Sequence, residues 1–287
     1  MTLIETINNA HARLAAVSIP DARRDAELLL CHSLGRNRAW LITHFQVALD
    51  EGIRRIFEGA VQRRSEREPL QYIIGRQEFW GLDFTVTPEV LIPRPETELI
   101  IESALRIGGG KDASLTIADL CTGSGCLAIS LAKEREQAQL FATDISATAL
   151  VVAMENARNH EVSARIRFLE GDLFEPLGEL DLRGRIDIIV SNPPYIPSGD
   201  LGALQPEVRD YEPGMALIAG PDGTEIQKRI INEAPEFMKK NGALILEMGL
   251  GQAAALAAFF KENGKYRAPE ILNDLAGIER VIVARKA

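Results

Sequence analysis

The stretch SNPPYIP, Ser191 to Pro197, follows the apolar run IDIIV and carries several groups that can bind a ligand. Two consecutive prolines fix φ and remove two backbone donors, so the oxygen atoms of Asn192 and Pro193 stand on a stiff backbone. Together these two oxygens can accept both hydrogens of a planar NH2 group, and Tyr195 can pack on that group. We therefore predict that Asn192, Pro193, Pro194 and Tyr195 bind the substrate, and that Asn192, Pro193 and Tyr195 are catalytic.

This pair of acceptors suits an amide or exocyclic amine that receives a methyl group. An amide nitrogen is a poor nucleophile, and acceptors that bind more strongly as positive charge grows on it stabilise the transition state more than the ground state. A sulfonium methyl donor is already activated, so no strong base is needed before attack. The four histidines, His11, His32, His44 and His160, lie outside these motifs. The alternative is a plain proline-rich loop with an Asx turn.

A glycine loop precedes SNPPYIP in the segment IADLCTGSGCLAISLA, which has the pattern of a strand, a short loop and a helix. Glycines permit a tight turn and let backbone amides approach a ligand at a helix N-terminus. We predict that Cys121, Thr122, Gly123, Ser124 and Gly125 bind a cofactor. The segment also fits GxGxxA, so a dinucleotide fold is allowed, but this motif is weak by itself.

Acidic residues end the next two predicted strands. Asp144 ends FATD, where a carboxylate can accept from both ribose hydroxyls. Its alternative role is a helix N-cap, which Ser146 can fill equally well. Asp172 in LEGDLF can accept from an adenine amino group with Leu173 beside the ring, although a turn aspartate is nearly as good an explanation. Asp144, Asp172, Leu173 and Asn192 complete the predicted cofactor site.

These motifs lie on alternating strands and helices. Strands are predicted at residues 114–120, 139–144, 165–172, 186–192, 242–249, 268–274 and 279–285, with helices after most of the early ones. This pattern predicts an α/β domain whose mostly parallel sheet is covered on both faces. Ligands of such folds bind at the carboxyl edge of the sheet.

The first seventy residues have apolar positions at helical spacing, with a helix start near Pro20 and Asp21 and a stop at Gly35. They predict a small helical bundle, which can be purely structural or a docking module. Aromatic, β-branched, Gly and Pro residues between Pro69 and Pro95 predict a hairpin. We expect a helical domain at 1–72, a hairpin linker at 73–95 and an α/β domain at 96–287.

The amino-acid composition disfavours some classes of binding partner and some cellular locations. The net charge is −9, and residues 1–75 are nearly neutral, which disfavours a nucleic acid held by phosphate contacts. No apolar run is long enough for a membrane span and no signal peptide is apparent. Three cysteines without metal-ligand spacing favour a reducing compartment and no metal. We expect a cytoplasmic protein.

At this point the sequence resembles the class I S-adenosylmethionine-dependent methyltransferases, and among them the release factor glutamine methyltransferases. NPPY alone is shared with DNA adenine methyltransferases, whereas LIPRPETE and the order of the blocks are more specific. The resemblance covers nearly the whole chain and rests on REPLQYIIG (67–75), EFWG (78–81), LIPRPETE (91–98), DLCTGSG (119–125), ATD (142–144), SNPPYIP, YEPGMALIAGPDG (211–223) and LEMGLGQ (246–252).

The resemblance implies a Rossmann-like, mostly parallel seven-stranded sheet and a helical substrate-docking domain. It implies transfer of a methyl group from S-adenosylmethionine, leaving S-adenosylhomocysteine, to the side-chain nitrogen of the glutamine in the Gly-Gly-Gln motif of class I peptide chain release factors. That modification would modulate translation termination. Carried over, Thr122 to Gly125 and Asp144 hold the cofactor, Asp172 and Leu173 flank its adenine, and Asn192 to Tyr195 hold the glutamine. A monomer is expected.

Three features depart from the family or have an open role. Cys121 stands where glycine is common, which should still permit the turn if its φ is negative there. GIER (277–280) differs from the usual Gly-Arg-Asp-Arg. In PRPETE, Arg94, Glu96 and Glu98 can order a lid over the cofactor or cap the following helix.

Four alternatives remain open: a glutamine methyltransferase for a ribosomal protein, a nucleic-acid amino-group methyltransferase, a non-catalytic adaptor and a nicotinamide oxidoreductase. The second would need a base-flipping surface. Intact cofactor and NPPY motifs argue against the third.

Overall fold

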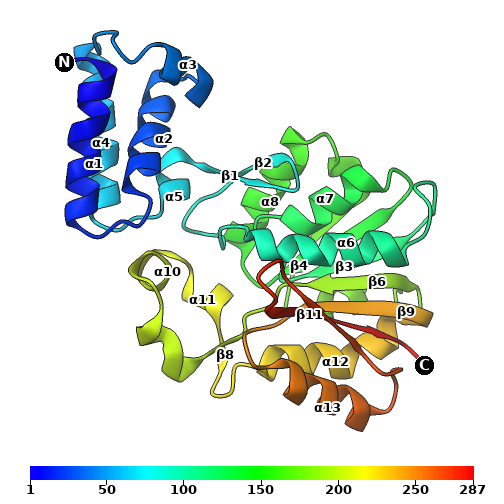
Figure 1. Cartoon of the computed structure of the whole chain (residues 1–287). Helices are drawn as coiled ribbons and strands as arrows, with labels where there is room; N and C mark the ends of the chain where they lie inside the picture. Colours follow the sequence, from blue (N-terminus) through cyan, green and yellow to red (C-terminus); the bar gives the residue numbers. More distant parts are fainter. The chain divides into compact units, whose positions relative to one another are not determined.

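The computed structural model describes residues 1–287 and contains two compact units. One unit comprises Met1–Arg76 and Gln205–Tyr211, and the other comprises Gln77–Leu204 and Glu212–Ala287. We call them the helical unit and the α/β unit (Figure 1). The boundaries 1–72, 73–95 and 96–287 stay a prediction.

The helical unit begins with five helices, α1 (Leu3–Ala16), α2 (Ala22–Leu34), α3 (Arg38–Thr43), α4 (Glu51–Ser65) and α5 (Leu70–Ile74). Three of them, α1, α2 and α4, have the apolar spacing found in the sequence. Thr2 and Glu5 form a capping box at the start of α1, and Gly35 ends α2 in the left-handed conformation. The buried apolar faces of these helices form one core, which includes Leu14, Leu29 and Phe57.

A buried ion pair ties these helices together. Arg64 of α4 donates to Asp25 of α2 (Nε to Oδ2, 2.8 Å), and both residues are buried. Arg64 also donates to Glu207 of α10 (Pro206–Tyr211; Nη1 to Oε1, 3.2 Å), as does Arg67 (Nη2 to Oε2, 2.8 Å). These bonds connect α10, which is distant in sequence, to the N-terminal helices of the same unit.

The predicted hairpin is present as β1 (Arg76–Phe79) and β2 (Leu82–Thr85). Trp80 and Gly81 join the strands with φ of 55° and 70°. Two consecutive residues with positive φ are typical of the type I′ hairpin turn.

A seven-stranded sheet forms the centre of the α/β unit, in the order β10-β11-β9-β6-β3-β4-β5. The strands β3 to β6 and β9 run parallel, whereas β11 is antiparallel to β9 and β10 is antiparallel to β11. The predicted mostly parallel sheet is therefore confirmed. The strand bounds are β3 (Thr116–Leu120), β4 (Gln139–Asp144), β5 (Ile166–Glu170), β6 (Ile186–Ser191), β9 (Met238–Glu247), β10 (Glu270–Asn273) and β11 (Glu279–Arg285).

Helices cover both faces of this sheet (Figure 1). On one face lie α6 (Glu98–Ile107), α7 (Cys126–Glu134) and α8 (Ala147–Asn159), and on the other α12 (Glu225–Phe237) and α13 (Ala253–Asn263). Successive strand residues alternate between the two cores, as Ile117 and Ala118 of β3 do. Burial on both faces explains the continuous apolar runs that predicted these strands.

Short elements make up much of the remaining chain of the two units. They are η1 (Pro95–Thr97), η2 (Ser163–Arg165), α9 (Glu175–Gly178), β7 (Ile196–Pro197), η3 (Ser198–Ala203), α11 (Gly214–Leu217) and β8 (Ile218–Gly220). Of these, β7 and β8 pair in parallel, which joins the end of SNPPYIP to the segment after α11. No helix has the length and apolarity that crossing a bilayer requires.

Candidate active site

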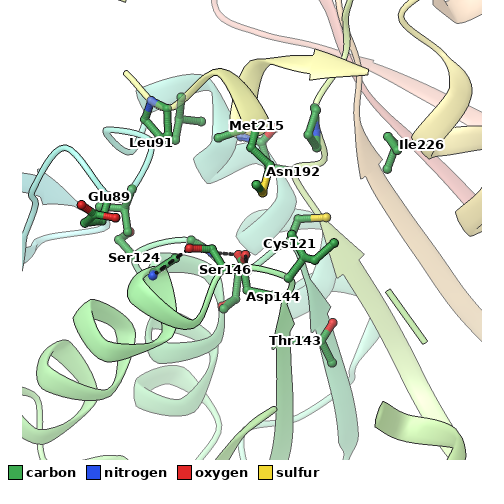
Figure 2. A pocket seen from close by; sticks show the side chains of 18 of the residues that line it. Glu89, Leu91, Cys121, Ser124, Thr143, Asp144, Ser146, Asn192, Met215 and Ile226 are labelled. Carbon is green, nitrogen blue, oxygen red and sulfur yellow. Dashed lines mark hydrogen bonds between the residues drawn. The ribbon is translucent and has the colours of Figure 1, made fainter. Parts of the chain in front are cut away.

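A cavity of about 500 Å³ lies within the α/β unit, where β3, β4 and β6 end (Figure 2). In the view of Figure 2, Asn192 and Met215 are drawn above Asp144 and Ser146. The wall contains nine of the twelve predicted site residues, namely Cys121, Thr122, Gly123, Ser124, Asp144, Asp172, Leu173, Asn192 and Pro194. Gly125, Pro193 and Tyr195 do not line it. The glycine loop, the acidic strand ends and the NPPY motif thus converge on one cavity.

The two glycines of the loop, Gly123 and Gly125, have different surroundings. Gly123 has φ of 54° and open space where a side chain would stand, so its backbone is accessible to a ligand. Gly125 caps α7 with φ of 81°, and a Cβ there would lie 3.1 Å from the Cβ of Ala153 in α8. Gly123 therefore leaves the backbone of the loop uncovered at the cavity wall, whereas Gly125 permits the close packing of helices.

Asp119, at the first position of DLCTGSG, accepts hydrogen bonds from this loop and from the start of α7. Its Oδ2 accepts from Thr122 Oγ1 (2.6 Å) and from the N–H of Ala128 (3.2 Å). Burial raises its pKa to about 7, and its Oδ1 has no partner in the protein. We did not single out Asp119 from the sequence, although an acidic residue just before a glycine loop was the available signal.

Asp144 orients its carboxylate through two backbone bonds. Its Oδ2 accepts from the N–H of Gly123 (2.8 Å), and its Oδ1 accepts from the N–H of Ser146 (2.9 Å). Ser146 Oγ caps α8 by accepting from the N–H of Ala149 (3.1 Å), so the capping role belongs to Ser146. Each oxygen of Asp144 keeps lone pairs for a ligand's hydroxyls. Burial raises the pKa of Asp144.

The condition stated for Cys121, a negative φ, is not met. Its φ is 57°, in the left-handed region that glycine adopts at lower cost, and Leu173 in the same wall has φ of 50°. The chain must turn sharply where β3 ends, and that turn sets the conformation whichever residue occupies the position. Two residues of one cavity wall therefore have left-handed backbone conformations.

Asp172 has a partner that the sequence did not suggest. Its Oδ2 accepts from Arg229 Nη2 of α12 (2.7 Å), and both side chains are partly exposed at the cavity. Leu173 beside it is buried. The pair positions the Asp172 carboxylate and leaves its other oxygen for a donor.

The side chain of Asn192 is hydrogen-bonded within the protein. Its Nδ2 donates to Thr97 Oγ1 (3.1 Å), and Thr97 Oγ1 donates to Glu247 Oε2 (2.6 Å). Thr97 and Glu247 are both buried. Burial raises the pKa of Glu247 to about 7, while hydrogen bonding by Thr97 and the charge of Arg280 lower it. Neither role was assigned from sequence, although both residues lie in the quoted LIPRPETE and LEMGLGQ blocks.

Tyr195 is held through its backbone. Its carbonyl accepts from Gln252 Nε2 (2.8 Å), which also donates to the carbonyl of Gly223 (3.0 Å). A Cβ on Gly223 would lie 2.6 Å from that Tyr195 carbonyl, so glycine is required there. Burial, and then the charge of Glu247, raise the pKa of the Tyr195 hydroxyl. Gln252 was another residue that the sequence did not single out.

The PRPETE segment is joined to the segment around α11. Arg94 Nη2 donates to the buried Glu212 Oε1 (2.5 Å), and Glu212 Oε2 accepts from the N–H of Ile92 (3.4 Å). No side chain caps η1 or α6. The capping role proposed for Arg94, Glu96 and Glu98 is therefore wrong, and Glu98 Oε1 instead accepts from the N–H of Trp80 (2.8 Å).

These donors and acceptors fit an adenosyl cofactor. Asp144 offers a carboxylate for ribose hydroxyls, and Gly123 offers an unobstructed backbone. We infer that the same cavity accommodates a target group beside Asn192, since Asn192 lines the same wall.

Comparison with known proteins agrees with this geometry. Residues 5–75 match the PrmC N-terminal domain family, and residues 101–203 match the methyltransferase small domain family. The catalytic domain of hMettl16, solved with the MAT2A 3'UTR hairpin 6, superposes with a TM-score of 0.59 at 17% identity, covering 78% of this chain and 81% of that one. At that identity the likeness concerns the fold alone.

Two relatives are similar over almost the whole chain. The release factor glutamine methyltransferase of Geobacter sulfurreducens is 44% identical, with 99% of this chain and 96% of that protein covered. The release factor glutamine methyltransferase of Nitratidesulfovibrio vulgaris is 40% identical, with 99% and 95% covered. Identity of this extent spans both the helical unit and the α/β unit. The chain therefore belongs to the family of release factor glutamine methyltransferases.

Proposed function

We propose that this protein transfers a methyl group from S-adenosylmethionine to the side-chain nitrogen of the glutamine in the Gly-Gly-Gln motif of class I peptide chain release factors. The observation that carries the proposal is the fixed amide of Asn192. Because its Nδ2 is bonded to Thr97, its Oδ1 is the atom left for the hydrogen of a target amide. We infer the target protein from family membership, and the methylation of an amide nitrogen from the residues of the site.

The residues divide between cofactor and substrate. Asp144 accepts from the ribose hydroxyls, Asp172 and Leu173 flank the adenine, and the backbone of Thr122 to Gly125 approaches the remainder. When bound, S-adenosylmethionine supplies a methyl group on a positively charged sulfur. No residue of the chain needs to act as a nucleophile.

Asn192 and Pro193 act on the target nitrogen. Asn192 Oδ1 and the Pro193 carbonyl each accept one of its hydrogens and hold its face toward the methyl carbon. Both bonds strengthen as positive charge develops on nitrogen, so they lower the barrier rather than only tighten binding. The nitrogen becomes strongly acidic as the new bond forms and then loses its proton to water. Tyr195 stiffens the segment through its backbone bond to Gln252.

The helical unit is proposed to dock the release factor. The enzyme is proposed to act as a monomer in the cytoplasm, where release factors work. A net charge of −9 disfavours nucleic acid as a direct partner.

Transfer of a labelled methyl group tests the proposal. The purified protein is incubated with methyl-labelled S-adenosylmethionine and a recombinant class I release factor, beside a copy in which the Gly-Gly-Gln glutamine is alanine. We expect label on the intact factor alone. Label on both copies, or on neither when calorimetry shows cofactor binding, would contradict the proposal and direct attention to ribosomal proteins.

A further inference from the structure

Thr97 and Glu247 lie behind Asn192 and form a chain of two hydrogen bonds with it. The Asn192 amide donates to Thr97 Oγ1 over 3.1 Å, and Thr97 Oγ1 is 2.6 Å from Glu247 Oε2. Thr97 is 1% exposed and Glu247 is 2% exposed, so water does not replace either bond. The three residues are far apart in sequence and come from η1, β9 and the end of β6.

The direction of these bonds follows from the number of protons. A threonine hydroxyl has one proton, and an ionised carboxylate can only accept. When Glu247 is ionised, Thr97 must give its proton to Glu247 and can only accept from Asn192. The NH2 end of the Asn192 amide then faces Thr97, and its oxygen is left for the substrate.

Protonation of Glu247 allows the directions of both hydrogen bonds to reverse. A neutral carboxyl group can donate to Thr97 Oγ1, which frees the threonine proton for the Asn192 oxygen. The amide can then turn over and present NH2 to a substrate that is itself an NH2 donor. Two donors facing each other do not bond, so the site loses one of its acceptors.

We propose that Thr97 and Glu247 are positioning residues that set the polarity of the Asn192 amide, and that the site is competent only when Glu247 is ionised. This inference rests on the proposed methylation of an amide nitrogen. It assigns a purpose to a buried carboxylate that neither binds the cofactor nor lines the cavity.

The groups around Glu247 place its titration near neutral pH. Burial raises its pKa to about 7, hydrogen bonding by Thr97 and the charge of Arg280 lower it, Glu96 raises it, and hydrogen bonding by Tyr195 lowers it. Arg280 also donates to Asp274 (Nε to Oδ2, 3.0 Å), so its charge is shared. Because the ionised form is the competent one, kcat should rise with pH through this range and level off above it.

The coupling can be measured without substrate. We expect the side-chain NH2 signals of Asn192 in a 15N-labelled sample, identified by their loss in Asn192→Ala, to shift as pH is changed through about 7. The shift should vanish in Glu247→Gln, which is isosteric and does not titrate. Signals that do not move in the wild type, or that move equally in Glu247→Gln, would overturn the proposal.

Kinetics on the release factor test the consequence. In Thr97→Val, which keeps the shape and removes the hydroxyl, kcat should fall about 10- to 100-fold with KM nearly unchanged, as expected for a hydrogen bond realised in the transition state. Thr97→Ser should restore most of the rate. Glu247→Gln should lower kcat similarly and abolish the pH step. Because the two act in series, the double variant should be no slower than the slower single variant.

Ser103→Ala is the matched control. It removes another buried hydroxyl, which donates to the carbonyl of Leu99 in α6 and has no connection to Asn192. It should leave kcat and its pH profile unchanged. Failure of Thr97→Ser to rescue, or additive losses in the double variant, would mean a structural role and overturn the proposal. Failure of the wild type to methylate the factor while the Asn192 signals still titrate would overturn the proposed function alone.

Discussion

Buried charged side chains have different partners in the helical unit and around the cavity of the α/β unit. In the helical unit, the buried Arg64 is bonded to Asp25, Glu207 and the carbonyl of Glu68. Around the cavity, Asp119 and Glu247 are buried without a directly bonded cation, and burial raises the pKa of each to about 7. The buried charge of the helical unit is neutralised by a bonded partner of opposite charge. Asp119 and Glu247 instead accept hydrogen bonds from neutral groups, and a raised pKa of this kind is common at functional sites.

Removing Arg64 should produce the largest loss of stability. Arg64→Met leaves Asp25 buried without its cation, so the free energy of unfolding should fall by about 3–5 kcal/mol. Urea unfolding measures this loss. Arg54→Met, at an exposed pair with Glu51, is the control and should leave the free energy of unfolding nearly unchanged. Equal losses in the two variants would remove the contrast between buried and exposed pairs.

Removing the Asn192 acceptor should have the largest effect on the cavity. Asn192→Ala should lower kcat about 10²- to 10³-fold, as loss of one group that stabilises the developing charge does in other enzymes. Calorimetry should show S-adenosylmethionine binding nearly unchanged, because we propose that the glycine loop and Asp144 contribute most of its binding. Survival of most of the activity would show that Asn192 is not catalytic.

Neutralising Asp144 should weaken cofactor binding rather than catalysis. Asp144→Asn places an NH2 group against the N–H of Gly123 or Ser146 and removes a charged acceptor, so affinity should fall by about 1.5–3 kcal/mol. Titration calorimetry with S-adenosylmethionine measures the change. Asp187→Asn, at the opposite end of the sheet, where Asp187 accepts from the N–H of Thr116, should leave cofactor affinity unchanged. A similar loss in both would point to general damage.

The smallest effect is expected at Cys121. A left-handed φ costs a non-glycine residue roughly 1–2 kcal/mol, and the freedom of glycine in the unfolded chain offsets about 0.4–1 kcal/mol of the relief. Cys121→Gly should therefore raise stability by at most about 1.6 kcal/mol, whereas Cys121→Val should destabilise, because β-branched residues tolerate this region poorly. Thermal unfolding compares the two. A glycine variant less stable than the valine variant would show that packing, not strain, governs this position.

The sequence predicted the secondary-structure elements better than the hydrogen-bond partners of the site residues. The inner strands of the sheet could be located because burial on both faces requires apolar runs, and the order of the motifs placed the glycine loop, Asp144 and Asn192 at one edge. The bonds from Asn192 to Thr97 and from Thr97 to Glu247 span 95 and 150 residues, and no local pattern encodes such pairings. The left-handed φ of Cys121 was missed for a related reason, since the turn, not the residue, sets it.

The most direct test of the central claim is a crystal structure with S-adenosylhomocysteine and a release factor fragment that contains Gly-Gly-Gln. We predict the target amide nitrogen at about 2.9 Å from both Asn192 Oδ1 and the carbonyl of Pro193, with Asn192 Nδ2 still bonded to Thr97. A glutamine whose nitrogen faces neither oxygen, or an Asn192 amide released from Thr97 in the complex, would contradict the account.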